Sequence, residues 1–271
     1  MRTGVSTASL FNRQPNEESL PYLDKLGVKT AEVFLTSFSE YGKEFGSLLA
    51  KCKGQVRVHS VHDLNTQFEP QLFNSNARTK KDAYYWLGQV MSAGQELGAT
   101  HYTFHGIARV KRATRSGVND DFTAMQKCFA EIYEFCDCYG IKLCLENVEW
   151  ASYNRVGVFS KIKEAVPTLG GVLDIKQARI SEYDYRDYLT EMGENLTHAH
   201  VSDINEKGKM CLPGKGKFDF EELILRLKDV GFDGPLIIEA YEKDYAEPIE
   251  LKTAVDYIDE LLYKHGCLSN G

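Results

Sequence analysis

Lys-Leu-Cys-Leu-Glu-Asn-Val-Glu-Trp, residues 142–150, is the stretch that decides the fold. It predicts a short β-strand that ends on a carboxylate, Glu146, and is followed directly by an amide and an aromatic side chain. Two other apolar runs, 171–174 and 236–239, also end on a carboxylate, and a fourth, 196–200, ends on a histidine. An apolar strand has no structural need for a charge at its end, so the pattern predicts one shared site.

Strands and helices are predicted to alternate along the whole chain. The predicted strands are 4–8, 30–35, 56–61, 101–105, 143–147, 171–175, 197–201 and 236–240. The predicted helices are 17–26, 41–51, 79–97, 121–139, 159–166, 185–192, 220–230 and 248–264. Eight such units in ~250 residues are typical of a closed (β/α)8 TIM barrel. We therefore expect α/β architecture and one domain, residues 1–271, with glycines ending several helices: Gly27, Gly98, Gly140 and Gly231.

Composition excludes several classes of protein. Hydrophobic residues make up 43% and charged residues 26% of the 271 residues, which is ordinary for a globular chain with a sizeable core. The formal net charge of −7 argues against a dedicated nucleic-acid surface. No apolar run reaches the ~20 residues of a membrane span, and no signal peptide is recognisable. The seven scattered cysteines are expected to be reduced thiols in a cytoplasmic protein.

The polar strand ends predict a metal site. In (β/α)8 barrels the active site lies at the carboxyl ends of the strands, and neighbouring strands are ~4.8 Å apart. Glu146, Asp174, His200 and Glu239 are therefore expected to converge on one divalent cation. Three carboxylates and one imidazole suit Mn²⁺, Mg²⁺, Co²⁺ or Zn²⁺. The alternative for each residue taken singly is a polar strand end bonded to a loop.

Histidines of the third and fourth strands are the next candidates. His59 and His105 are expected to end these strands at the same rim, either as ligands of a second metal or as substrate contacts. His101 and His198 begin their strands, so we expect them in the lower part of the barrel.

Five motifs resemble the xylose isomerase-like TIM barrel superfamily, which holds sugar and sugar-phosphate isomerases and epimerases, inositol-catabolic enzymes and endonuclease IV. The motifs are Leu-Glu-Asn, Leu-Asp-Ile-Lys-Gln-Ala, His-Val-Ser-Asp, Pro-Gly-Lys-Gly-Lys-Phe-Asp-Phe and Ile-Ile-Glu-Ala. The resemblance implies that the four strand-end residues are metal ligands. It also implies that His59 and His105 fall where endonuclease IV carries ligands for a further zinc.

The chain departs from the family pattern in two places. The family often has a histidine three residues after the aspartate of the sixth strand, where this chain has Gln177. Endonuclease IV has an Asp-x-His where this chain has Gly208 and Met210, so the ligands of its third zinc are absent. We expect one metal ion, leave a second open and do not expect a third. Gln177 thus stands where the family often has a histidine that contacts the substrate.

The predicted activity is metal-dependent isomerisation or epimerisation of a sugar or sugar phosphate through an enediolate. By resemblance to the epimerases, Glu146 and Glu239 are the pair that removes and returns the proton. Trp150 is expected to stack on the sugar, unless it only packs. Glu32 is expected to bind a sugar hydroxyl, and Arg109 a substrate phosphate or carboxylate, unless its basic loop is simply solvated.

Three other functions remain open at this stage. One is an endonuclease IV-like phosphodiesterase acting on abasic DNA, which the acidic net charge and the missing third-zinc ligands oppose. Another is an inositol-type dehydratase using the same site. The third is a barrel that binds a metal or small ligand without catalysis. The expected partner is a small sugar or sugar phosphate rather than nucleic acid or membrane, and the resemblance to related enzymes suggests a homo-oligomer.

Overall fold

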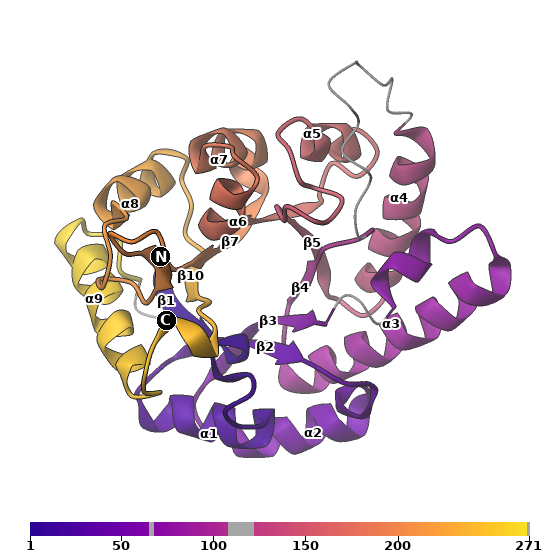
Figure 1. The fold of residues 1–271 in the computed structure, drawn as a ribbon. Coiled ribbons are helices and arrows are strands. Elements are labelled where there is room, and N and C mark those ends of the chain that lie inside the picture. The colour runs from indigo at the N-terminus through magenta and orange to yellow at the C-terminus, as the bar shows by residue number, and fades with distance from the viewer. Residues whose placement is uncertain (65–67, 108–121, 270–271) are drawn as a thin grey trace.

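Apolar strands alternate with helices, as predicted, and the strands close into a barrel with helices around its outside (Figure 1). The computed structural model describes residues 1–64, 68–107 and 122–269. Within them the barrel order is β1-β10-β7-β6-β5-β4-β3-β2, with every neighbouring pair parallel. The barrel strands are β1 Arg2–Ser6, β2 Thr30–Leu35, β3 Arg57–Asp63, β4 His101–Phe104, β5 Lys142–Glu146, β6 Gly170–Asp174, β7 Leu196–Val201 and β10 Pro235–Ile238. The predicted (β/α)8 TIM barrel is confirmed.

Helices form the outer layer. They are α1 Asn16–Lys25, α2 Lys43–Cys52, α3 Ala77–Leu97, α4 Thr123–Asp137, α5 Val158–Lys163, α6 Ile175–Ile180, α7 Tyr185–Met192, α8 Phe220–Asp229 and α9 Glu250–Lys264. Short 3-10 helices are η1 Thr7–Leu10, η2 Phe38–Glu40, η3 Glu69–Phe73, η4 Gly193–Asn195 and η5 Glu242–Asp244. The longest, α3, ends at Gly98, whose φ of 73° is the left-handed conformation predicted for this glycine. Among the described helices, none combines the length and hydropathy that crossing a membrane requires.

Strand alternation separates the core from the site. In β5, Leu143 and Leu145 belong to the hydrophobic core that the helices cover, together with Phe129 of α4. Cys144 and Glu146 therefore point the other way, into the barrel. The same alternation places a polar side chain at the inner carboxyl end of each neighbouring strand.

Three predictions about the elements need correction. The strand predicted as 56–61 runs to Asp63, because it keeps pairing with β2 as far as Leu35. Helix α6 begins directly after Asp174, where the strand was expected to continue. After β7 the chain forms a small antiparallel pair, β8 Asp203–Ile204 and β9 Met210–Cys211, that the sequence did not reveal.

Candidate active site

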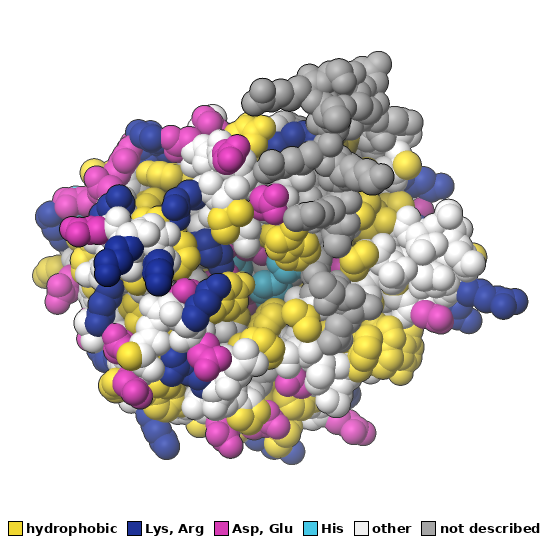
Figure 2. Space-filling model, viewed as in Figure 1, with side chains coloured by type: hydrophobic (Ala, Val, Ile, Leu, Met, Phe, Trp, Pro, Cys, Tyr) yellow, Lys and Arg dark blue, Asp and Glu magenta, His cyan; other side chains and the backbone are white. Residues whose placement is uncertain are grey.

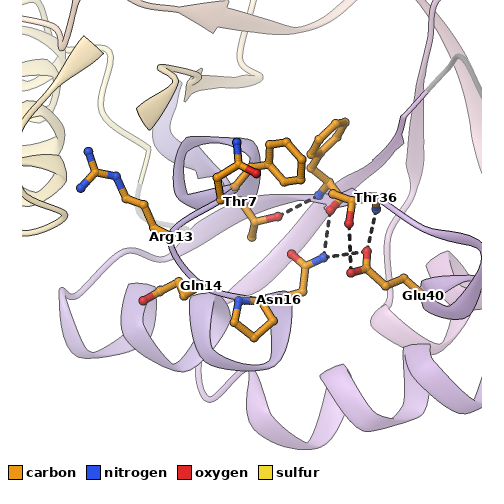
Figure 3. Close-up of a pocket in the computed structure, with 10 residues that line it drawn as sticks. Thr7, Arg13, Gln14, Asn16, Thr36 and Glu40 are labelled. Carbon is orange, nitrogen blue, oxygen red and sulfur yellow. Dashed lines mark hydrogen bonds between the residues drawn. The ribbon is translucent and has the colours of Figure 1, made fainter. Parts of the chain in front are cut away.

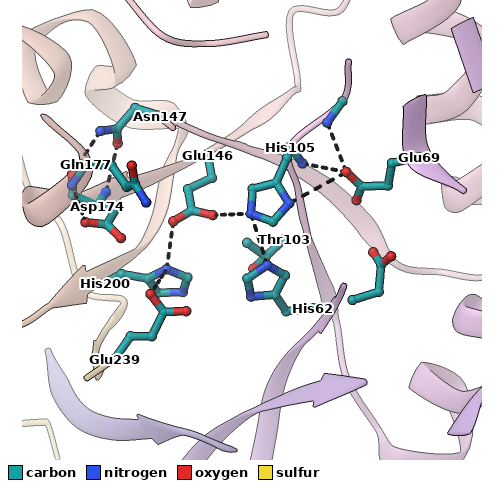
Figure 4. A network of polar contacts seen from close by, with 12 residues as sticks. His62, Glu69, Thr103, His105, Glu146, Asn147, Asp174, Gln177, His200 and Glu239 are labelled. Atoms are coloured by element: carbon teal, nitrogen blue, oxygen red, sulfur yellow. Dashed lines mark hydrogen bonds and ion pairs between the residues drawn. The ribbon is translucent and has the colours of Figure 1, made fainter. Parts of the chain in front are cut away.

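Four strand-end side chains meet at the carboxyl end of the barrel (Figure 4). Glu146 ends β5, Asp174 ends β6, His200 lies near the end of β7 and Glu239 directly follows β10. All four are buried, with at most 4% of each residue exposed. One potential ligand atom from each lies within 4.8 Å of the others. Three carboxylates and an imidazole at this spacing fit a divalent cation.

Asn147 explains why the amide of the Leu-Glu-Asn motif follows Glu146. Its side-chain Nδ2 donates to the backbone carbonyl of Asp174 at 2.9 Å, and its Oδ1 accepts from the backbone N–H of Asp174 at 2.8 Å. Asp174 in turn caps helix α6, because its Oδ1 accepts from the backbone N–H of Gln177 at 2.8 Å. These bonds fix Asp174 relative to the end of β5.

Lys176 lies against the acidic part of this cluster, and sequence reasoning missed it. Its Nζ is 3.1 Å from Oε2 of Glu239 and 3.6 Å from Oδ2 of Asp174, and only 7% of the residue is exposed. Burial by itself would lower the pKa of Lys176, but these two carboxylates raise it well above its usual value. Burial also raises the pKa of Asp174 to about 6, against the opposing effect of Lys176.

His62, not His59, reaches the rim of the barrel. The pairing of β2 with β3 shifts register, so Ala31 pairs with Val58 and Glu32 with Ser60, which leaves His59 in a bulge. The His59 ring stacks on His101 with ring centroids 4.3 Å apart, near the start of β4. The prediction that His59 ends its strand at the mouth is therefore wrong. His62 lies one residue beyond the predicted strand 56–61, and the bulge that orients it leaves no signal in the sequence.

His62 and His105 form a second group with Glu146. Nε2 of His105 lies 2.9 Å from Oε2 of Glu146 and 3.1 Å from Nε2 of His62. This trio could hold a second ion, since its potential ligand atoms also lie within 4.8 Å of one another. Burial by itself would lower the pKa of His105, but Glu146 and Glu69 raise it to about 10. The raised pKa favours the imidazolium form of His105 in its pairing with Glu146.

Glu32 lies beneath the cavity rather than on its wall. It is fully buried, and its carboxylate accepts from Ser6, Ser60 and Thr103 at 2.7–3.1 Å. Its Oε1 is also 3.1 Å from Nε2 of His200. Burial would raise the pKa of Glu32, but the neighbouring histidines, His200 first, hold it well below its usual value. These contacts contradict the expected sugar contact, and Glu32 instead orients His200, as carboxylates behind metal-binding histidines do.

A cavity of about 110 Å³ opens above the cluster. Histidine side chains are visible on its floor, bordered by hydrophobic side chains, in the hollow at the centre of Figure 2. The described residues that line it are Phe34, His62, Asp63, Leu64, His105, Glu146, Val148, Trp150, Gln177, Glu239 and Tyr241. Trp150 and Gln177 therefore lie where substrate contacts were expected. The Trp150 ring packs against the His105 ring, with the ring centroids 5.1 Å apart. Arg109 lies outside the described residues.

A second cavity of about 390 Å³ adjoins the first across Phe34, which lines both (Figure 3). Most of the residues that line it are polar, and Nδ2 of Asn16 donates to Oε2 of Glu40 at 3.3 Å. Glu40 also accepts from the backbone N–H of Thr36 at 2.6 Å. Asn16 and Glu40, two of the polar side chains of this cavity, thus already have protein partners.

Asp203 gives the His-Val-Ser-Asp motif a structural role. Its two carboxylate oxygens accept from the backbone N–H groups of Gly214, Gly216 and Phe218 at 2.9–3.1 Å. The carboxylate thereby shapes the Pro-Gly-Lys-Gly-Lys loop. Lys215 of this loop lies 2.8 Å from Glu250, so it is engaged on the outer surface.

Comparison with known proteins agrees with the barrel fold. Residues 20–261 match the family described as xylose isomerase-like TIM barrel. Fructoselysine 3-epimerase of Escherichia coli O157:H7 is 21% identical over 92% of this chain and 93% of its own length. Two further curated relatives are matched over only 40% and 39% of their own length.

Solved structures show the same fold at low identity. The D-psicose 3-epimerase of Clostridium cellulolyticum H10, crystallised with D-tagatose, superposes with a TM-score of 0.78 at 17% identity, covering 97% of this chain and 99% of that one. The IolI protein, crystallised with a zinc atom, superposes with a TM-score of 0.73 at 14% identity, covering 99% of this chain and 100% of the IolI chain. With the match over residues 20–261, the chain belongs to the xylose isomerase-like TIM barrel family.

Proposed function

We propose that this protein is a divalent-metal-dependent epimerase that inverts the configuration at C3 of a ketose, the carbon next to the carbonyl. One observation carries the proposal: of the four clustered donors, Glu146 and Glu239 line the cavity, whereas Asp174 and His200 do not. Two carboxylates that face one substrate are what removal and return of a proton require. The relatives named 3-epimerases support the same reaction.

The four donors would hold the metal, and Glu146 and Glu239 would carry the proton. A divalent ion, when bound, supplies Lewis-acid stabilisation of negative charge on the substrate oxygens. One glutamate takes the C3 proton as a base, which leaves an enediolate. The other, as a carboxylic acid, returns a proton to the opposite face of C3, so the configuration inverts. Mn²⁺, Mg²⁺, Co²⁺ and Zn²⁺ all suit this donor set.

The cavity suits an uncharged sugar better than a sugar phosphate. Among the described residues that line it, three are acidic, Asp63, Glu146 and Glu239, and none is lysine or arginine. A phosphate group is usually held by arginine, lysine or backbone N–H groups. Trp150 and Phe34 offer apolar surface for the carbon-bound hydrogens of a sugar, and Gln177 offers an amide for its hydroxyl groups.

Deuterium exchange tests the proposal directly. The Mn²⁺-loaded protein is incubated in D₂O with D-fructose, D-psicose, D-tagatose, L-ribulose or fructoselysine, and the sugars are followed by proton NMR. We expect at least one ketose to lose its C3 proton signal and to yield its C3 epimer. A product that has lost water would indicate a dehydratase instead. If the C3 proton of every ketose is retained, the proposed epimerase is wrong.

A further inference from the structure

Lys176 occupies a position where a lysine is unfavourable for folding. It lies in the first turn of α6, and helix N-termini favour negative rather than positive charge. Burying an ammonium costs free energy unless it is paired, and only 7% of Lys176 is exposed. Its Nζ lies 3.1 Å from Glu239 and 4.5 Å from the centre of the Tyr241 ring. A buried positive charge at a helix N-terminus is unfavourable in its local setting, and such exceptions are expected at functional sites.

The charges of the candidate metal site give Lys176 a role. The donor set holds three carboxylates and one imidazole. A divalent ion supplies two positive charges, so the four donors and the ion together would keep one negative charge in a buried site. The ammonium of Lys176 contacts the carboxylates of Asp174 and Glu239 and supplies the third positive charge.

We propose that Lys176 is a positioning residue: a built-in counter-cation that acts through Asp174 and Glu239 and lowers the affinity of the site for divalent ions. Lys176 is not one of the described residues that line the cavity, whereas Glu239, which it contacts, is one of them. Lys176 therefore acts from behind the carboxylate and does not touch the sugar. The inference rests on the proposed metal site but not on the identity of the sugar.

Metal titration of matched variants tests the proposal. Metal-free protein is titrated with Mn²⁺ by calorimetry as wild type, Lys176→Met, Lys176→Arg and Lys215→Met. Methionine keeps an unbranched apolar chain without the charge, and arginine keeps the charge. Lys215 is the control, because its ion pair with Glu250 lies on the surface. Lys176→Gln replaces the methionine variant if that variant does not fold.

The sign of the change decides the outcome. We expect Lys176→Met to bind Mn²⁺ at least ten-fold more tightly than wild type, with Lys176→Arg within about three-fold of wild type and Lys215→Met unchanged. The metal-free methionine variant should also melt at a lower temperature than metal-free wild type, and saturating Mn²⁺ should remove the difference. A purely structural role would instead weaken binding and lower the melting temperature with and without the ion.

Two failures can be told apart. If wild type itself binds no Mn²⁺, Co²⁺ or Zn²⁺, the proposed metal site is wrong, and the role of Lys176 is wrong with it. If wild type binds an ion but Lys176→Met binds it equally or more weakly, only the counter-cation is wrong. With a ketose that the protein epimerises, Lys176→Met should lower kcat and leave KM within about two-fold, because its effect passes through Glu239.

Discussion

Asn147 and Asp174 exchange two hydrogen bonds between the ends of β5 and β6, at 2.8 and 2.9 Å. Both residues are at most 1% exposed, so no water replaces these bonds. Asn147 is therefore the residue that holds one candidate ligand, Asp174, beside another, Glu146. This pairing places the two ligands before any ion arrives.

Asn147→Leu should weaken metal binding at the candidate site without abolishing it. The substitution leaves the buried N–H and C=O of Asp174 without partners, which costs about 1–3 kcal/mol of unfolding free energy. Removing a residue that orients a ligand weakens metal affinity by roughly 10–100-fold. Urea unfolding and Mn²⁺ calorimetry measure the two effects. Unchanged Mn²⁺ affinity would mean that Asp174 is positioned by other contacts.

Glu146→Gln and Glu239→Gln should each abolish turnover. Both side chains line the cavity, and general acid–base catalysis contributes about 10²–10⁴-fold. We therefore expect kcat for C3 epimerisation to fall by at least about 10²-fold in each variant. Glu164→Gln is the control, because Glu164 pairs with Lys161 on the surface. A Glu239→Gln variant that keeps wild-type kcat would remove Glu239 from the proton transfer.

Removing the metal should lower both activity and stability. An ion that binds only the folded protein adds about 2.7 kcal/mol to the unfolding free energy when its concentration is 100 times Kd. Treatment with EDTA should therefore abolish epimerisation and lower the melting temperature, and Mn²⁺ should restore both. Thermal melts with and without Mn²⁺ measure the stability change. Full activity after exhaustive chelation would contradict metal dependence.

Mn²⁺ affinity should fall in mild acid. The pKa of Asp174 is raised to about 6 in the metal-free protein, mainly because the side chain is buried. Below this pH the carboxyl holds a proton that must leave before it can bind an ion, and above it no such proton is lost. Burial alone would lower the pKa of His200, but Glu32 and Glu146 raise it well above its usual value, so this ligand must also lose a proton on binding. Affinity should thus fall as the pH falls across the whole range, and more steeply below pH ~6. Calorimetry between pH 5 and 8 in several buffers measures both affinity and proton release.

His105 should make the metal-free protein less stable in alkali. Its folded pKa of about 10 lies above the ordinary value near 6.5, owing to Glu146 and Glu69. A raised pKa of the folded state adds to the unfolding free energy, and this contribution is fully present below pH ~6.5. It is lost as the pH rises towards 10, by up to ~1.4 kcal/mol for each pH unit. Urea unfolding at pH 6.5–9.5 should show this loss in wild type but not in His105→Gln. Parallel slopes in both proteins would show that His105 is neutral.

The sequence by itself determined the barrel and the composition of its candidate site. Alternating apolar strands and amphipathic helices specify the layers, because each element must bury one face. The residues Glu146, Asp174, His200 and Glu239 stood out because a charge at the end of an apolar strand needs a reason. Parallel strands then bring such ends together, whatever the details of the loops. Even helix α6 left a signal, since Asp174 and Gln177 have the spacing of a helix cap.

Only the tertiary structure decided which other side chains join the site. A bulge at His59 turns His62 towards His105, and a bulge depends on the register with β2 rather than on local sequence. Glu32 could be assigned a supporting role only when its partners from β1, β3 and β4 were seen around it. The burial of Lys176 against Glu239, 63 residues away, likewise follows from the closing of the barrel, which brings the residues after β6 close to those after β10. Such contacts join residues that are distant in the chain, so their energies appear only when the barrel closes.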